Sequence, residues 1–307
     1  MISAVVCTFN PRADYLERTL RSILAQDLDA DSWELIVIDN ASDSPVSDLP
    51  FVAENEIHVV QESRPGLTAA KEAGSRVARG DVVTFVDDDN VLAPDYLRGV
   101  DELFRDDRIG VIGPNVAPEY EVEPPNWFRD PRIEASVVVR RLPDRRLYVS
   151  SVPETSFYFP EGAGSSLRRE ILISYFDSLT ERDRIEGRQG GKLSGGEDWD
   201  MGFFALSRGY LVGTSGNLQL THLIPEGRLD PDYLARLMRG SLDSAEQVND
   251  KWRGVFGQDV VSYFRGSPTQ ELLKAVFHGA RATSTNHRLL AGFHAYLARM
   301  LWRRAKG

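Results

Sequence analysis

Cysteine, histidine and long apolar runs are all scarce in this chain of 307 residues. A single cysteine, Cys7, excludes a disulfide framework and favours a reducing compartment. No pair among the five histidines has the spacing of a zinc site. No apolar run approaches the roughly 20 residues of a membrane span, and Met1 leads into an apolar strand without the order of a signal peptide. We therefore expect a soluble cytoplasmic protein.

A surplus of positive charge is also missing, because the formal net charge is −10. A general nucleic-acid binder needs a basic surface for the phosphate backbone, so we expect no nucleic-acid partner. An anionic substrate would instead need a local cation. Gly162-Ala163-Gly164 lacks the third glycine of a dinucleotide fingerprint, and neither a phosphate loop nor a Gly-x-Ser-x-Gly elbow occurs.

Three adjacent carboxylates, Asp87, Asp88 and Asp89, end the apolar run at residues 82–86 (VVTFV). Such a run predicts a strand buried on both faces, and the C-terminal end of a strand in an open α/β sheet borders the ligand crevice. Adjacent carboxylates repel one another, and oxygen ligation of Mg²⁺ or Mn²⁺ would compensate them. A solvated acidic turn before the next helix is the alternative.

The first third of the chain alternates strands and helices, which predicts a doubly wound, mostly parallel α/β sheet. Asp39 ends a second apolar run, so its carboxylate could accept hydrogen bonds from a base or ribose hydroxyl. After residue 115 the prolines and Trp127 predict a surface excursion that shapes an acceptor pocket or merely crosses over. We further expect a hairpin from residues 137–140 and 147–152, joined by a turn around Pro143-Asp144, and two strands at 210–214 and 218–221.

A second acidic pair, Glu197 and Asp198, follows a glycine-rich stretch and opens a predicted helix. If both acidic groups converge, one can hold a metal while the other accepts a proton, which suits displacement of a diphosphate leaving group. The helix N-terminus lowers the pKa of Asp198, whereas neighbouring acids raise it. The sequence does not decide between these effects.

Residues 226–307 are predicted to be helical and more basic than the rest. An apolar stripe there either packs onto the main domain or rests, with its flanking arginines, on an anionic membrane surface. The second alternative would make the protein peripheral at the inner membrane face.

Taken together, several segments resemble the family 2 glycosyltransferases in their order and spacing. They are AVVCTFN (4–10), LRSILAQ (20–26), ELIVIDNASD (34–43), RPGLTAAK (64–71), FVDDD (85–89), GAG (162–164) before RRE (168–170), and GED (196–198). The resemblance covers roughly residues 1–225. It implies a GT-A fold with a nucleotide-sugar half at 1–113 and an acceptor half at 114–225. It also implies an inverting transfer from a nucleotide-diphosphate sugar, most plausibly a UDP-sugar, to a saccharide or lipid-linked acceptor in polysaccharide or glycoconjugate synthesis.

The resemblance also assigns roles by position. Thr8 and Asp39 would contact the nucleoside, and Arg64 and Lys71 would flank the base or diphosphate. Asp88 and Asp89 would hold ribose and the Mn²⁺ or Mg²⁺ ion, with Asp87 supporting them. Gly162, Ala163 and Gly164 would lie along the donor sugar, and Asp198 would be the base beside Glu197. His222 is either a further metal ligand or a structural residue. Asn90 departs from the pattern, since many relatives carry an acid or an aromatic residue there.

Three rival functions remain open on the sequence. A nucleotidyltransferase on a related fold also uses metal-binding carboxylates, but it would need a basic glycine-rich loop that is not found near the N-terminus. A nucleotide-sugar-binding module would have no catalytic base. A glycosidase with paired carboxylates would need neither metal nor nucleotide.

Overall fold

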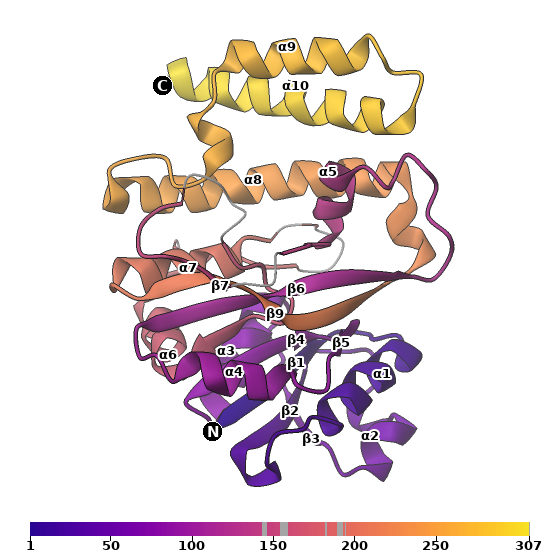
Figure 1. Cartoon of the computed structure of the whole chain (residues 1–307), viewed down its shortest axis with the longest axis vertical. Coiled ribbons are helices and arrows are strands. Elements are labelled where there is room, and N and C mark those ends of the chain that lie inside the picture. The colour runs from indigo at the N-terminus through magenta and orange to yellow at the C-terminus, as the bar shows by residue number, and fades with distance from the viewer. Residues whose placement is uncertain (143–145, 154–158, 182, 189–192, 194, 307) are drawn as a thin grey trace.

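A computed structural model describes the chain except residues 143–145, 154–158, 182, 189–192, 194 and 307. One curled sheet forms its centre, with helices on both faces and further helices stacked beyond it (Figure 1). The strand order is β3-β2-β1-β4-β8-β6-β9-β5, and β7 pairs with β9. The strands are β1 Ile2–Thr8, β2 Trp33–Asp39, β3 His58–Gln61, β4 Val82–Asp87, β5 Asn90–Leu92, β6 Ile109–Tyr120, β7 Arg146–Val149, β8 Ser166–Arg168 and β9 Leu211–Ile224.

The helices connect these strands and then continue beyond them. They are α1 Ala13–Leu24, α2 Pro50–Glu54, α3 Leu67–Val77, α4 Tyr96–Phe104, α5 Pro131–Glu134, α6 Arg169–Ser178, α7 Glu197–Ser207, α8 Pro231–Phe256, α9 Pro268–Gly279 and α10 Thr285–Lys306. The expected alternation of strand and helix is confirmed through β4.

The sheet is parallel in the first third of the chain and mixed elsewhere. Strands β3, β2, β1 and β4 run parallel to one another, as short crossovers through helices require. Strand β8 then inserts antiparallel between β4 and β6, while β6 and β9 pair in parallel. The carboxyl ends of β1, β2 and β4 therefore share one edge, with Thr8 opposite Asp39 and Cys7 opposite Asp87.

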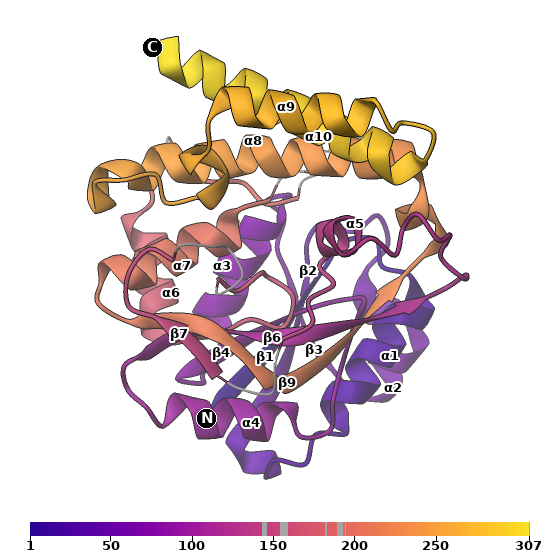
Figure 2. The same ribbon diagram turned by 45° about the horizontal axis from the view of Figure 1, so that its top comes forward.

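Alternate residues of the central strands enter two different hydrophobic clusters. On one face, Val5 and Ile36 pack with residues of α3, α6, α7 and α8. On the other, Val6 and Val37 pack with residues of α1 and α4. Figure 2 shows α4 on the side of the sheet away from α7. Both faces are thus buried, which explains why these strands are continuous apolar runs in the sequence.

Two predictions beyond residue 115 are wrong. No hairpin forms from residues 137–140 and 147–152, because residues 135–137 form a 3₁₀ turn and Val138 follows it in the left-handed conformation. Arg140 bridges to Val116 of β6, and β7 pairs with β9 instead. The two strands expected at 210–214 and 218–221 are one strand, β9, whose pairing with β6 shifts register at Pro114/Asn115 and so absorbs the break. The expected turn at Pro143-Asp144 lies outside the described residues.

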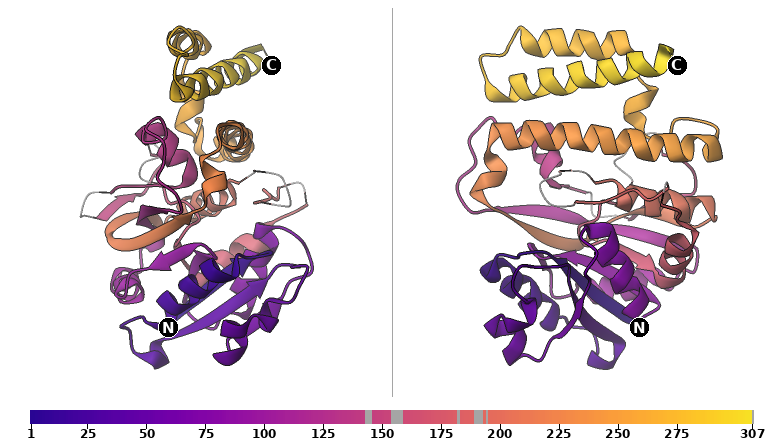
Figure 3. Two further views of the ribbon diagram at one scale, coloured as in Figure 1. Left: turned by 90° about the vertical axis from the view of Figure 1, so that its right-hand side faces the viewer. Right: turned by 180° about the vertical axis from the view of Figure 1, so that it is seen from behind.

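The three C-terminal helices form layers above the sheet, with α8 next to it and the α9–α10 pair outermost (Figure 3). The apolar stripe of α10 faces inward, and Leu290, Leu297 and Met300 are buried in the core. This confirms that the stripe packs on the rest of the chain. No described helix combines the length and apolarity that a bilayer crossing requires. A helical extension at 226–307 stays a proposal, and it is compatible with the end of β9 at Ile224 and the start of α8 at Pro231.

Candidate active site

Three aspartates stand where β4 leaves the shared sheet edge. Thr8, at the end of β1, donates a hydrogen bond from its hydroxyl to the Asp88 carboxylate. Burial and the charge of Asp89 raise the pKa of Asp88 to about 7. Burial followed by Asp89 also raises the pKa of Asp87. Without a compensating cation this cluster therefore favours a partly protonated state.

Asp89 differs from its two neighbours because it faces His222 of β9. Burial opposes its ionisation, but the charge of His222 and the contact between them lower the pKa of Asp89. Nε2 of His222 lies 3.3 Å from Oδ2 of Asp89, and Asn90 donates to Oδ1 at 2.9 Å. Asn90 and His222 are paired residues of β5 and β9, so the sheet register itself brings Asp89 to the histidine.

Asp89 and His222 together are suited to a divalent cation that binds along with a diphosphate. Nδ1 of His222 and Oδ1 of Asn90 are buried and have no hydrogen-bond partner among the residues that the structure describes, which is unusual for buried polar atoms. No three acidic, histidine or cysteine side chains converge as a complete metal site within the described parts of the chain. Asp89 and His222 thus offer two ligands, and diphosphate oxygens would have to complete the coordination of Mn²⁺ or Mg²⁺.

The second acidic pair lies in the first turn of α7, as the sequence predicts. Gly196 precedes it with φ of 99°, and Glu197 then accepts a hydrogen bond from Nζ of Lys71 at 2.8 Å. Asp198 accepts from the backbone amide of Gly162 at 2.7 Å and from that of Trp199 at 2.8 Å. The Gly162 loop and α7 therefore fix the orientation of the Asp198 carboxylate.

Burial is the largest influence on Asp198, and the charge of Glu197 is the next. Together they raise the pKa of Asp198 to about 7, although Lys71 and the Trp199 amide act in the opposite direction. The helix N-terminus is thus outweighed. A carboxyl group with this pKa can accept a proton near neutral pH.

Lys71 of α3 joins the two acidic groups. Its side chain is 2% exposed. Burial opposes its charge, but Glu197, Asp198 and Asp87 together raise its pKa. One buried ammonium therefore lies within the electrostatic reach of carboxylates from β4 and from α7. Lys71, Gly162 and Asp198 also line one small cavity with Phe85 of β4.

The predicted donor-sugar segment packs tightly against this region. An added Cβ on Gly162 would lie 3.1 Å from Nζ of Lys71. On Gly164, which has φ of 70°, it would lie 2.6 Å from Leu220. The carbonyl of Gly164 accepts from the Tyr96 hydroxyl at 2.6 Å, and Ala163 is buried. At Gly164 only glycine permits this approach without strain, whereas at Gly162 a side chain would require the end of Lys71 to shift by a few tenths of an ångström.

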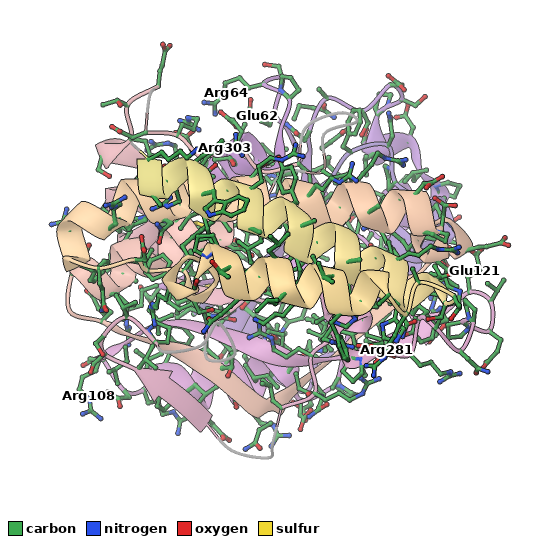
Figure 4. All side chains as sticks on the ribbon, turned by 90° about the horizontal axis from the view of Figure 1, so that it is seen from above. Glu62, Arg64, Arg108, Glu121, Arg281 and Arg303 are labelled. Carbon is green, nitrogen blue, oxygen red and sulfur yellow. The ribbon has the colours of Figure 1, made fainter. Side chains whose placement is uncertain are left out.

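Two of the expected nucleotide-binding residues have partners within the protein, and their contact with a nucleotide stays a prediction. Asp39 is fully buried and accepts hydrogen bonds from the backbone amides of Ser42 and Val46 and from Gln61. It thereby holds the turn after β2. Arg64 is half exposed at the periphery, paired with Glu62 at 2.8 Å (Figure 4) and with Glu72 at 3.2 Å.

Trp127 lies against Phe128, with ring centroids 5.7 Å apart, in the cluster beneath α8. The contribution of this segment to an acceptor site stays a prediction. Half of the glycine-rich stretch at 187–196, residues 189–192 and 194, lies outside the described residues.

Asp200 is a residue that sequence reasoning missed. Its carboxylate is fully buried one turn into α7 and accepts from Tyr175 at 2.6 Å, Lys251 at 2.7 Å and Trp252 at 2.6 Å. Lys251 and Trp252 belong to α8, so Asp200 anchors the helix carrying Asp198 to the C-terminal extension. The sequence signal for Asp200 was a third acidic residue within the four positions 197–200.

Replacing Asp200 by asparagine should lower the free energy of unfolding by about 3 kcal/mol, because it leaves Lys251 without its buried counter-charge. Chemical denaturation would measure this. The matched control is Asp243→Asn, since the exposed Asp243 also accepts from a tyrosine hydroxyl, that of Tyr296, at 2.8 Å. Equal stability of the two variants would contradict the anchoring role.

The fold and this arrangement can be compared with solved structures. The structure is similar to the mannosyltransferase PcManGT from Pyrobaculum calidifontis in complex with GDP-Man and Mn²⁺, with a TM-score of 0.63 and 19% identity, covering 99% of this chain and 87% of that one. It is also similar to S. aureus TarS 1-349 in complex with UDP-GlcNAc, with a TM-score of 0.52 and 14% identity, covering 100% of this chain and 92% of that one. The expected GT-A fold is thereby confirmed.

The sequence comparisons then give the family. The family described as Glycosyl transferase family 2 matches residues 3–176, and the chain belongs to this family. It is 27% identical over 131 residues to the glucosyl-dolichyl phosphate glucuronosyltransferase of Haloferax volcanii, which is 41% of this chain and 42% of that protein. It is 29% identical over 179 residues to an uncharacterized glycosyltransferase of Nostoc sp., which is 57% of this chain and 53% of that protein. The chain thus spans about half the length of these curated relatives.

Proposed function

We propose that the protein is a metal-dependent inverting glycosyltransferase that moves a sugar from a nucleotide-diphosphate sugar to an acceptor hydroxyl. The observation that carries this proposal is the position of Lys71, a buried cation close to carboxylates at the end of β4 and at the start of α7. This position supports a single site bordered by both acidic groups, as the division between metal binding and proton transfer requires.

The donor half of the site would bind the nucleotide and its metal. Asp89 and His222 would hold Mn²⁺ or Mg²⁺, which supplies positive charge to the leaving diphosphate. Thr8 and Asp88 would meet the nucleoside and ribose, with Asp87 supporting them. Arg188 and Arg228 lower the pKa of Asp89 through their charges, so both lie close enough to favour a bound anion.

The acceptor half would move one proton. The acceptor oxygen forms a bond to the anomeric carbon while the bond from that carbon to the diphosphate oxygen breaks, and the leaving diphosphate takes the electron pair. The acceptor proton passes to the Asp198 carboxylate, which the amides of Gly162 and Trp199 hold in place. Attack opposite the leaving group inverts the anomeric carbon. Glu197 would keep the ammonium of Lys71 beside Asp198.

The donor and acceptor are proposed only by class. The solved neighbours carry GDP-Man in one case and UDP-GlcNAc in the other, which supports a nucleotide sugar without distinguishing the base. We propose a UDP-sugar, and a saccharide or lipid-linked acceptor in polysaccharide or glycoconjugate synthesis. The lipid-linked alternative has support in the printed name of the Haloferax relative, a glucosyl-dolichyl phosphate glucuronosyltransferase.

Replacing Asp89 by alanine should weaken donor binding in the presence of Mn²⁺ by at least about 100-fold, because one of the two protein ligands is lost. Titration calorimetry with UDP and UDP-sugars, with and without Mn²⁺, would measure the change, and His222→Ala should reduce the same metal-dependent part. The control is Asp107→Ala, whose side chain is 99% exposed. Equal Mn²⁺-dependent affinity in Asp89→Ala and the control would refute this assignment.

A further inference from the structure

The outermost helix, α9, has its polar and apolar faces reversed. Its inward residues are Glu271, Ala275 and His278, all buried against α10. Its outward residues are large and apolar, with exposed fractions of 38% for Leu272, 64% for Leu273, 61% for Val276 and 50% for Phe277. A helix at the surface of a water-soluble protein normally shows the opposite pattern. The outward face therefore forms a contiguous apolar patch of the kind that marks an interaction site.

The polar interior of this helix pair is satisfied, so the reversal has a structural basis. Glu271 accepts from Lys274 at 2.5 Å and pairs with His294 of α10 at 2.7 Å. Nδ1 of His278 lies 2.8 Å from Nδ1 of His287. These contacts fix the rotation of α9 on α10, and the apolar face must then point away from the molecule.

Basic residues predominate in the chain segment that forms this outer layer, although Arg304 is paired with Asp250 and Asp259. From residue 266 onward Glu271 is the only acid, although the whole chain has a net charge of −10. The basic residues of this segment are Lys274, Arg281, Arg288, Arg299, Arg303, Arg304 and Lys306. Arg299 and Arg303 are exposed on α10 with Trp302, which is 48% exposed. Figure 4 shows Arg281 and Arg303 toward opposite ends of this outer layer.

We propose that the outer face of α9 and α10 docks on an anionic lipid bilayer surface. Exposed Leu, Val and Phe side chains can enter the boundary between head groups and acyl chains, while arginines and lysines attract anionic lipids. Tryptophan is enriched at this depth. A second copy of the chain is a poorer occupant, because a twofold contact would place these like charges against one another.

This surface replaces the one expected from the sequence. The apolar stripe of α10 is buried and cannot meet lipid, so α9 supplies the apolar contact and α10 supplies cations. Docking is independent of catalysis. If the proposed function also holds, docking would keep the enzyme at the surface where a lipid-linked acceptor resides.

Vesicle co-sedimentation without nucleotide or metal tests the proposal. The protein should bind vesicles that contain phosphatidylglycerol, bind those of phosphatidylcholine alone at least about tenfold more weakly, and lose binding as salt is raised. Leu273→Ser/Val276→Ser and Arg299→Gln/Arg303→Gln should each weaken binding about tenfold or more.

Two matched controls keep the test specific. Val255→Ser removes an equally exposed apolar side chain of α8, at 61%, and Arg105→Gln/Arg108→Gln removes exposed cations far from the patch. Both should bind like the parent protein. Binding that is absent at low salt, or that survives both patch variants, would overturn the proposal. So would a dimer, seen by light scattering, that Leu273→Ser/Val276→Ser dissociates. Because UDP binding is measured separately, failure of docking leaves the proposed function untouched.

Discussion

Replacing Asp198 by asparagine is expected to lower kcat by about 10²–10⁴-fold while donor binding with Mn²⁺ stays within about twofold, since general-base catalysis contributes an effect of that size. Asparagine preserves the shape of the side chain, and its one carbonyl oxygen can accept from the amide of Gly162 or from that of Trp199 but not from both, because these amides donate to different oxygens of Asp198. It cannot take a proton. Steady-state transfer assays and calorimetry on the same preparation would separate the two effects.

The pH dependence of the parent enzyme gives an independent measure of the same group. Burial and Glu197 raise the pKa of Asp198 to about 7, and the base must be ionised to act. Transfer should therefore increase as pH rises through about 7. The control is Asp177→Asn, an exposed carboxylate on α6, which should keep both activity and profile. A fully active Asp198→Asn variant would refute the assignment of the base.

Replacing Lys71 by methionine is expected to lower the free energy of unfolding by about 3–5 kcal/mol, as removal of one partner from a buried ion pair does. Glu197 has a side chain only 6% exposed and would lose its counter-charge, and Asp198 and Asp87 would lose a nearby cation. Donor binding should weaken as well, because the loss affects both acidic groups. Thermal and chemical denaturation would measure the first effect and calorimetry the second.

The direction in which the stability of Lys71→Met changes with pH distinguishes the loss of a counter-charge from a packing defect. Without Lys71, burial should raise the folded-state pKa of Glu197 above its unfolded value. The protonated form of Glu197 then contributes stability at low pH, and this contribution is lost as pH rises through the raised pKa. The deficit of Lys71→Met should thus grow from acidic to neutral pH, and Glu197→Gln in the same chain should reduce it. Lys306→Met, at an exposed position, is the control. A pH-independent deficit would contradict the compensating role.

The sequence predicted the parts of the site that lie at the ends of regular elements. Apolar runs define β1, β2 and β4, and a polar residue after each run marks the shared sheet edge. The same reasoning placed Glu197 and Asp198 at the start of α7, where the structure has them. Local patterns suffice in these cases because both faces of the strands are buried and the helix start follows a glycine.

The remaining features of the fold depend on pairing between residues far apart in the sequence, which local patterns do not reveal. Pro118 argued for an irregular excursion, yet it lies in β6, which pairs with β9 throughout this stretch but with β8 only at Val111 and Ile112. Proline, which has no backbone N–H, is tolerated where the edge of a strand has no partner strand. Asp39 is held mainly by the turn that follows it, through the amides of Ser42 and Val46. The partners of Asp200 lie on α6 and α8 and come close only by folding, so the local sequence did not mark Asp200 as an anchor.

We propose that one cleft holds a metal-bound diphosphate between the acids of β4 and the base of α7. Crystals grown with Mn²⁺ and a UDP-sugar, measured at the manganese absorption edge, test it most directly. We expect one anomalous peak at about 2.2 Å from oxygen of Asp89 and nitrogen of His222, with the anomeric carbon lying between the diphosphate and Asp198. A manganese peak remote from Asp89, or a bound donor whose sugar lies away from Asp198, would contradict the account.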